Sequence, residues 1–248
     1  MMITNMRSLL LAAVVVISVS APAAAEIRWY TDFKQASAAA QKANLPMFID
    51  FWADWCAACK IMDAEVYTDA KVIRTFEDKA IGVRIHFDLQ PDLARKFNVP
   101  ALPYLLFTNS YGTPLLYSRG FLEAEDLSKI LEAMPSLGRI NELDQALQAN
   151  KNDAVSLVAM GRELRDAAFW EASNTFYDRA LKQRAVRNDA ALREAVSYET
   201  ALNWLELQDG KKAATLLAKW LKDFPNGARK ADVQAALLRA RELERELE

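Results

Sequence analysis

Residues 50–60, Asp-Phe-Trp-Ala-Asp-Trp-Cys-Ala-Ala-Cys-Lys, decide how the rest of this sequence is interpreted. The overlapping run from Met47 to Trp52 is almost entirely apolar, as a buried central strand would be. The run that follows, Ala57 to Val66, carries apolar side chains at helical spacing. The sequence therefore predicts that its only two cysteines, Cys56 and Cys59, lie where a helix begins directly after a buried strand.

Two cysteines at this spacing favour redox chemistry over a structural disulfide. A disulfide between them would close so short a loop that it would remove little entropy from the unfolded chain. A thiol at a helix N-terminus faces unpaired backbone N–H groups and the positive end of the helix dipole, which favour the thiolate. We therefore expect the pKa of Cys56 to fall below the free value of about 8.5. Cys56 would attack a substrate disulfide, and Cys59, one turn further along, would resolve the mixed disulfide.

The first part of the chain, up to about residue 134, alternates between short β-like runs and helical segments. The β-like runs are 27–30, 47–52, 81–87, 104–107 and 115–117, and the helical segments are 33–42, 57–66, 72–76, 91–97 and 122–134. The turn residues at 109–112 predict a hairpin between the last two strands. This order predicts an α/β domain with a mixed central sheet flanked by helices.

The segment around the cysteines resembles the active site of the thioredoxin family. The block from Ala53 to Lys60 is most similar to the C-terminal domain of the DsbD disulfide reductases. The resemblance covers about residues 27–134 and implies a thioredoxin fold. It implies that Asp50 is a buried acid that moves the proton of the resolving thiol, and that Pro103 is a cis-proline facing the disulfide.

The same resemblance implies further site residues around this centre. It implies that Trp55, Leu102 and Gly120 contact substrate, that Trp52, Lys60 and Arg84 support the site, and that Asp88 ends the third strand. One departure concerns Ala57-Ala58, which replaces the Gly-Pro of thioredoxins. Because this dipeptide tunes the redox potential in the family, the direction of electron flow stays open between a reductase and an oxidase or isomerase.

The pattern of the sequence changes after the turn-forming residues 135–138. Residues 139–248 are helical throughout and rich in Ala, Leu, Arg and Glu. Gly161, Ser173, Tyr177 and Ala180 recur 40 residues later as Ala201, Ala213, Leu217 and Trp220. These offsets are typical of tetratricopeptide-like helix pairs if an insertion is assumed near residues 185–189. A plain helical bundle remains the alternative.

The first 25 residues are expected to be a signal peptide rather than part of the fold. Arg7 precedes an apolar run over residues 9–19, and residues 21–25 supply small side chains for cleavage before Glu26. An uncleaved membrane anchor is the alternative. The expected organisation is a signal peptide (1–25), a thioredoxin-like domain (26–135) and a helical repeat domain (139–248), in a periplasmic protein without stable membrane insertion after cleavage.

Other chemistries fit the sequence less well. Zinc favours four ligands, but the chain has two cysteines and a single histidine, His86, which we expect to be a packed or edge side chain. A copper carrier is weaker, because no Met or His apart from Met62 stands close to the thiols in sequence. Asp50 could alternatively be a core carboxyl paired with Arg84, and Asp54 is expected to face solvent.

These features predict an exported thiol–disulfide oxidoreductase that acts on protein disulfides through Cys56 and Cys59. No cofactor beyond this redox-active disulfide is expected, because no flavin or nucleotide motif is present. Electrons would come from an upstream membrane thiol–disulfide donor. The net charge of −2 gives no sign of nucleic-acid binding. The alternative is a redox-linked binding or scaffold protein, in which the helical repeats hold a client while the thioredoxin domain recruits or senses.

Overall fold

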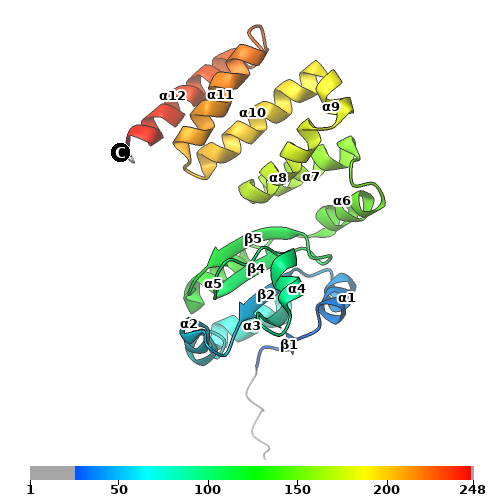
Figure 1. Ribbon diagram of the computed structural model, residues 1–248, viewed down its shortest axis with the longest axis vertical. Helices are drawn as coiled ribbons and strands as arrows, with labels where there is room; N and C mark the ends of the chain where they lie inside the picture. Colours follow the sequence, from blue (N-terminus) through cyan, green and yellow to red (C-terminus); the bar gives the residue numbers. More distant parts are fainter. Residues whose placement is uncertain (1–25, 247–248) are drawn as a thin grey trace, which may run out of the picture.

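The computed structural model describes residues 26–246 (Figure 1), so the predicted signal peptide lies outside the described residues. The first part contains β1 (Trp29–Tyr30), α1 (Phe33–Ala43), β2 (Met47–Trp52), α2 (Ala57–Ile61), the π-helix η1 (Met62–Val66), α3 (Ala70–Lys79), β3 (Ile81–His86), α4 (Pro91–Lys96), β4 (Tyr104–Thr108), β5 (Pro114–Arg119) and α5 (Ala124–Glu132). The second part contains α6 (Gly138–Ala149), α7 (Ala154–Asp166), α8 (Trp170–Leu181), α9 (Arg184–Asn188), α10 (Ala190–Glu206), α11 (Gly210–Asp223) and α12 (Lys230–Glu246). The predicted fold class, a thioredoxin fold followed by an all-helical region, is confirmed.

The sheet has the strand order β1-β3-β2-β4-β5. Strand β3 runs parallel to β1 and β2, whereas β4 runs antiparallel to both β2 and β5. The carboxyl ends of β2, β3 and β5 therefore meet the amino end of β4 at one end of the sheet. The segments that follow β2 and precede β4 carry the cysteines and Pro103, so the topology brings them to the same end.

Helices cover both faces of the sheet and enclose two apolar cores (Figure 1). One core lies under α1 and α4 and contains Ile49 and Phe51 of β2. The other lies under η1, α3 and α5 and contains Phe48 of β2. Asp50 lies between these apolar residues and is itself 1% exposed. A buried carboxyl group in such a strand is costly unless it is paired or neutral.

Local signals explain where the structure departs from the predicted boundaries. The helix predicted over 72–76 is longer, because the side chain of Asp69 caps α3 by accepting from the N–H groups of Lys71 and Val72. The helix predicted over 57–66 is one continuous segment, but its hydrogen bonding changes from α to π at Met62.

The helical part is built from antiparallel pairs, with α7 against α8 and α10 against α11 (Figure 1). Residues that recur at 40-residue spacing lie in these contacts: Tyr177 covers Gly161 in the first pair, and Ala201 and Leu217 are fully buried in the second. The assumed insertion near 185–189 coincides with the short helix α9. Membership of the tetratricopeptide class stays a prediction.

The two parts are joined by a packed interface. Leu137, which lies in the turn-forming segment predicted to separate the two parts, is 1% exposed. Asp144 of α6 accepts hydrogen bonds from Asn109 Nδ2 (3.1 Å) and Thr113 Oγ1 (2.9 Å) of the β4–β5 hairpin. Leu115 of β5 belongs to the same apolar core as the inner side chains of α6, α7 and α8. Between residues 26 and 246, no helix is long and apolar enough to cross a bilayer.

The α7–α8 contact predicts a large effect for a single methyl group. A Cβ atom at Gly161 would lie 2.3 Å from Cε1 of Tyr177, whereas a Cβ atom at Gly138 would meet nothing within 4 Å. Gly161→Ala should therefore lower the free energy of unfolding by about 1–3 kcal/mol through overpacking. The control Gly138→Ala should leave it unchanged or slightly higher. Urea unfolding of both variants tests this, and equal stabilities would contradict the helix pairing.

Candidate functional site

Cys56 and Cys59 form a disulfide at the start of the first helix after β2. Their Cα atoms are 5.3 Å apart, and Cys56 is the N-cap residue of α2. The backbone N–H of Cys59 donates to Cys56 Sγ at 3.2 Å. Cys56 is 5% exposed and Cys59 is 2% exposed. The cysteine whose sulfur receives a backbone hydrogen bond is therefore also the slightly more exposed residue, as an attacking thiol requires.

Asp50 is buried in β2, the strand that leads to the helical segment with the two cysteines. Burial is the largest influence on its carboxyl group and raises the pKa from 3.8 to about 7, against the opposing effect of the Arg84 cation. Arg84 Nε lies 3.2 Å from Asp50 Oδ2, at ion-pair distance but without hydrogen-bond alignment. Within residues 26–246 no group donates a well-aligned hydrogen bond to either carboxyl oxygen. Asp50 can therefore take up or release a proton near neutral pH.

Arg84 connects this buried acid to a second carboxylate nearer the surface. Its Nη2 atom lies 2.9 Å from Oδ1 of Asp63, which stands one turn after Cys59 on the same helical segment. The guanidinium group lies over the ring of Trp52, 4.5 Å from its centroid. Arg84 is thus fixed between two acids and an aromatic face. This arrangement supports the predicted placement of Arg84 beside Asp50, and Trp52 is half-buried against it.

The Leu102–Pro103 peptide bond is cis, as the resemblance predicts. The carbonyl of Pro103 accepts a hydrogen bond from the N–H of Gly120 at 2.9 Å, so the segment before β4 is tied to the residue after β5. Gly120 has φ of +87°, a conformation that favours glycine. Leu102 is half-buried beside them. The topology places these residues at the same end of the sheet as Cys56.

Trp55 presents the largest aromatic surface next to the disulfide. Its side chain is 64% exposed, and its Nε1 donates to Asp88 Oδ2 at 2.8 Å. The predicted surface position of Trp55 is therefore found. The hydrogen bond to Asp88, which lies two residues after β3 rather than at its end, fixes the orientation of the ring. Lys60 is exposed on α2 and forms no ion pair with any residue between 26 and 246.

His86 packs against the site rather than extending from it. Its ring contacts Trp52 edge-on with centroids 4.8 Å apart, and its Nε2 lies 3.3 Å from Oδ2 of Asp54. The Asp54 side chain is 87% exposed, as expected for a solvent-facing residue. Among residues 26–246 no cluster of three or more His, Cys, Asp or Glu side chains could hold a metal ion.

The part of the chain that contains this site matches a known protein family. The thioredoxin family model matches residues 30–133. These residues form a thioredoxin-family domain. Thioredoxin 1 of Chlorobaculum tepidum is 41% identical over 63 residues, which is 25% of this chain and 59% of the relative. The thiol:disulfide interchange protein DsbD of Yersinia pestis is 32% identical over 103 residues, which is 40% of this chain and 17% of that protein.

Among solved structures, the oxidised C-terminal domain of Neisseria meningitidis DsbD aligns with a TM-score of 0.37 and 21% identity. The alignment covers 42% of this chain and 97% of that domain. The 32% identity with DsbD over 103 residues confirms the sequence resemblance to DsbD for the thioredoxin domain. This chain spans 59% of the length of the thioredoxin relative and 17% of that of DsbD.

The thioredoxin domain also contains one site residue that sequence analysis missed. Asp63 does not stand out in the sequence, because a single acid on a helix surface is common. The available signal was its spacing: Asp63 follows Cys59 by four residues, so both lie on one side of the helical segment. The predicted roles of the other site residues remain predictions, although the structure gathers them at one end of the sheet.

The buried carboxyl group predicts a pH-dependent stability. The pKa of Asp50 is about 7 in the folded protein, against an ordinary value of 3.8. Its ionisation therefore destabilises the folded state progressively as the pH rises from about 4 to 7, and by a constant amount above that. Asp50→Asn should raise the free energy of unfolding of the oxidised protein by about 2–4 kcal/mol at pH 8 and change it little at pH 4.

Denaturant unfolding at the two pH values measures this difference. The control is Asp54→Asn, which removes an exposed carboxylate from the same segment and should have a small effect at both pH values. An Asp50→Asn effect of equal size at pH 4 and pH 8 would show that the carboxyl group is not held at a raised pKa.

Proposed function

We propose that this protein is a periplasmic dithiol reductase or interchange protein that acts on disulfides of other proteins through Cys56 and Cys59. The observation that carries the proposal is the Cys56–Cys59 pair at the start of a helical segment, which follows a strand whose buried carboxyl group, Asp50, has its pKa raised to about 7. The relatedness of the domain to thioredoxin and DsbD supports the same chemistry.

In the reduced protein, the first step is attack by the Cys56 thiolate on one sulfur of a client disulfide. A mixed disulfide forms between Cys56 and the client, and the other client sulfur leaves as a thiolate, which takes a proton from solvent. The N–H of Cys59, which points at Cys56 Sγ, stabilises negative charge on the attacking sulfur. The exposed ring of Trp55 offers the client an apolar contact beside this sulfur.

The second step needs a deprotonated Cys59, which is the more buried of the two thiols. The ionised Asp50 carboxylate accepts the Cys59 proton, either directly or through an intervening water. The Cys59 thiolate then attacks Cys56 Sγ, the second client thiolate is released, and the Cys56–Cys59 disulfide re-forms. Two electrons have passed to the client. The neutral Asp50 carboxyl group then gives its proton to the released client thiolate, directly or through solvent, and Arg84, which stays paired with Asp63, stabilises the Asp50 carboxylate that re-forms.

Turnover requires an external dithiol that reduces the Cys56–Cys59 disulfide again. We assign this role to a membrane thiol–disulfide donor, because the sequence has no flavin or nucleotide motif of its own. Export through the predicted signal peptide would place the protein in the compartment where such a donor meets client disulfides. Periplasmic fractionation with N-terminal sequencing tests this placement, which requires a mature chain that begins at Glu26.

The alternative function is a binding protein in which the helical part holds a client and the thioredoxin domain only recruits or senses. Insulin reduction coupled to dithiothreitol distinguishes the two. Cys56→Ser should lower the rate at least about 1,000-fold, because it removes the attacking thiolate. Cys59→Ala should instead accumulate a mixed disulfide with the client. If Cys56→Ser keeps its reductase activity, the proposed enzymatic role of Cys56 is contradicted. If Cys56→Ser loses this activity but still binds the client and keeps the cellular phenotype, the binding-protein alternative is favoured.

The direction of electron flow is decided by the reduction potential of the Cys56–Cys59 pair. Reductants of this class lie near roughly −270 mV and oxidants near roughly −120 mV. Equilibration with glutathione buffers should give a value near the reductant end. A value near the oxidant end would reassign the protein as an oxidase while leaving the roles of the two cysteines unchanged.

A further inference from the structure

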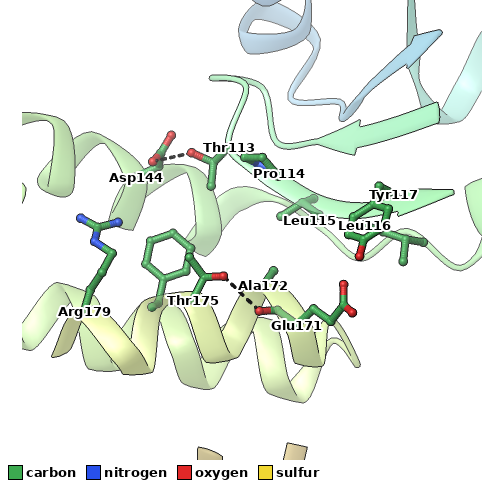
Figure 2. A pocket seen from close by; sticks show the side chains of 11 residues that line it. Thr113, Pro114, Leu115, Leu116, Tyr117, Asp144, Glu171, Ala172, Thr175 and Arg179 are labelled. Atoms are coloured by element: carbon green, nitrogen blue, oxygen red, sulfur yellow. Dashed lines mark hydrogen bonds between the residues drawn. The ribbon is translucent and has the colours of Figure 1, made fainter. Parts of the chain in front are cut away.

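A groove of about 380 Å³ lies between β5 and α8, where the two parts of the chain meet (Figure 2). Leu116 and Tyr117 of β5 form one wall, Glu171 and Thr175 of α8 form the other, and Asp144 of α6 lies at one end. We call this the β5–α8 groove. Neither part of the chain forms it alone, so it exists because α6 holds the helices against the β4–β5 hairpin.

The backbone of β5 gives the groove one edge that can form hydrogen bonds. Strand β5 is the last strand of the sheet, and no other strand between residues 26 and 246 pairs with its outer side. The N–H of Gly120 donates to Pro103, so by the alternation of an antiparallel ladder the N–H and C=O groups of Tyr117 and Arg119 point outward. Such an edge accepts an extended polypeptide as an added strand.

The groove lies along β5, the strand directly before Gly120, whose N–H donates to the carbonyl of Pro103. Tyr117, in its wall, stacks on Tyr104 with ring centroids 5.7 Å apart and an angle of 14° between the ring planes. Tyr104 directly follows Pro103 in the chain. Tyr117 precedes Gly120 by three residues, which is ~10 Å along a strand. A client segment that extends from a disulfide at Cys56 along the edge of β5 would therefore enter the groove within a few residues.

The charges in the groove favour a basic side chain on the occupant. Asp144 is 7% exposed and accepts hydrogen bonds from the neutral groups of Thr113 and Asn109. In the part of the chain that the structure describes, neither Asp144 nor Glu171 forms an ion pair. Arg179 is the cation in the lining, and one of its N–H groups is occupied by the carbonyl of Lys151 at 2.7 Å. The lining thus carries two acids without ion pairs and one cation, and Arg119 lies at its margin over the Tyr117 ring.

We propose that the β5–α8 groove binds an extended segment of the client polypeptide that carries a basic side chain a few residues from the client's disulfide. The inference rests on the proposed oxidoreductase function and gives the helical part a role in substrate selection. The client's backbone pairs with Tyr117 and Arg119, and its basic side chain lies near Glu171. A small disulfide without a polypeptide chain would not use the groove.

The test compares two peptide disulfides and one small disulfide as oxidants of the reduced protein. The peptides are disulfide-linked dimers of a nine-residue chain that has one cysteine and, four residues away, either Lys or Glu. The small disulfide is 5,5′-dithiobis(2-nitrobenzoate). Stopped-flow tryptophan fluorescence gives the second-order rate constant for each oxidant, and the peptide rate constants are divided by that of the small disulfide.

In the natural protein, the Lys peptide should react about threefold faster than the Glu peptide, as expected for a partly exposed charge pair. Thr175→Trp fills the groove and should lower the normalised rate constant of the Lys peptide at least about fivefold. The matched control is Thr215→Trp, at the exposed position 40 residues later on α11, which should behave like the natural protein. Glu171→Gln should bring the two peptide rate constants close together without filling the groove.

Equal rate constants for the two peptides in the natural protein, or a normalised Lys-peptide rate that Thr175→Trp leaves unchanged, would overturn the proposal. An equal fall for all three oxidants would also overturn it. Light scattering tests whether a second copy of the chain occupies the groove instead. A dimer of the natural protein that becomes monomeric in Thr175→Trp would show this and would overturn the proposal. Failure of the proposed function is distinct, because the natural protein would then not react with the small disulfide either.

Discussion

The proposed chemistry of this protein depends on an ionisable carboxyl group, Asp50, that is buried in the strand leading to the pair of cysteines. Asp50 lies among apolar residues in a buried strand, and this burial raises the pKa of its carboxyl group to about 7. Arg84 limits the cost by lying 3.2 Å away without neutralising the group through an aligned hydrogen bond. The carboxyl group is therefore able to exchange a proton at the pH where the thiols react.

The rest of the domain holds this arrangement in place. The antiparallel reversal at β4 brings Pro103 to the end of the sheet where the segment after β2 places Cys56, and Gly120 joins them through its hydrogen bond to Pro103. The helical part lies away from α2 (Figure 1), and its helix α8 closes one side of the β5 edge. One consequence is that substrate selection and thiol chemistry reside in different parts of the chain, connected by the stacked pair of Tyr104 and Tyr117.

Most of the thioredoxin domain could be predicted from sequence because its signals are local. The apolar run ending at Trp52, the cysteine spacing and the Leu102–Pro103 dipeptide each indicate one structural element at one place. Asp63 could not be predicted in the same way, since its role arises only when β3 presents Arg84 to the helix. The groove between β5 and α8 was also unpredictable, because residues 135–138 indicated only a boundary and gave no sign that Leu137 packs into a core.

The central claim is that the position of Cys56 at the start of a helical segment lowers the pKa of its thiol. The most direct measurement is the rate of iodoacetamide alkylation of Cys56 as a function of pH, made on the reduced Cys59→Ala protein so that a single thiol is followed. A midpoint clearly below the free-cysteine value of about 8.5 is the predicted result. A midpoint at or above that value would contradict it, because Cys56 would then have no greater tendency to ionise than an ordinary cysteine.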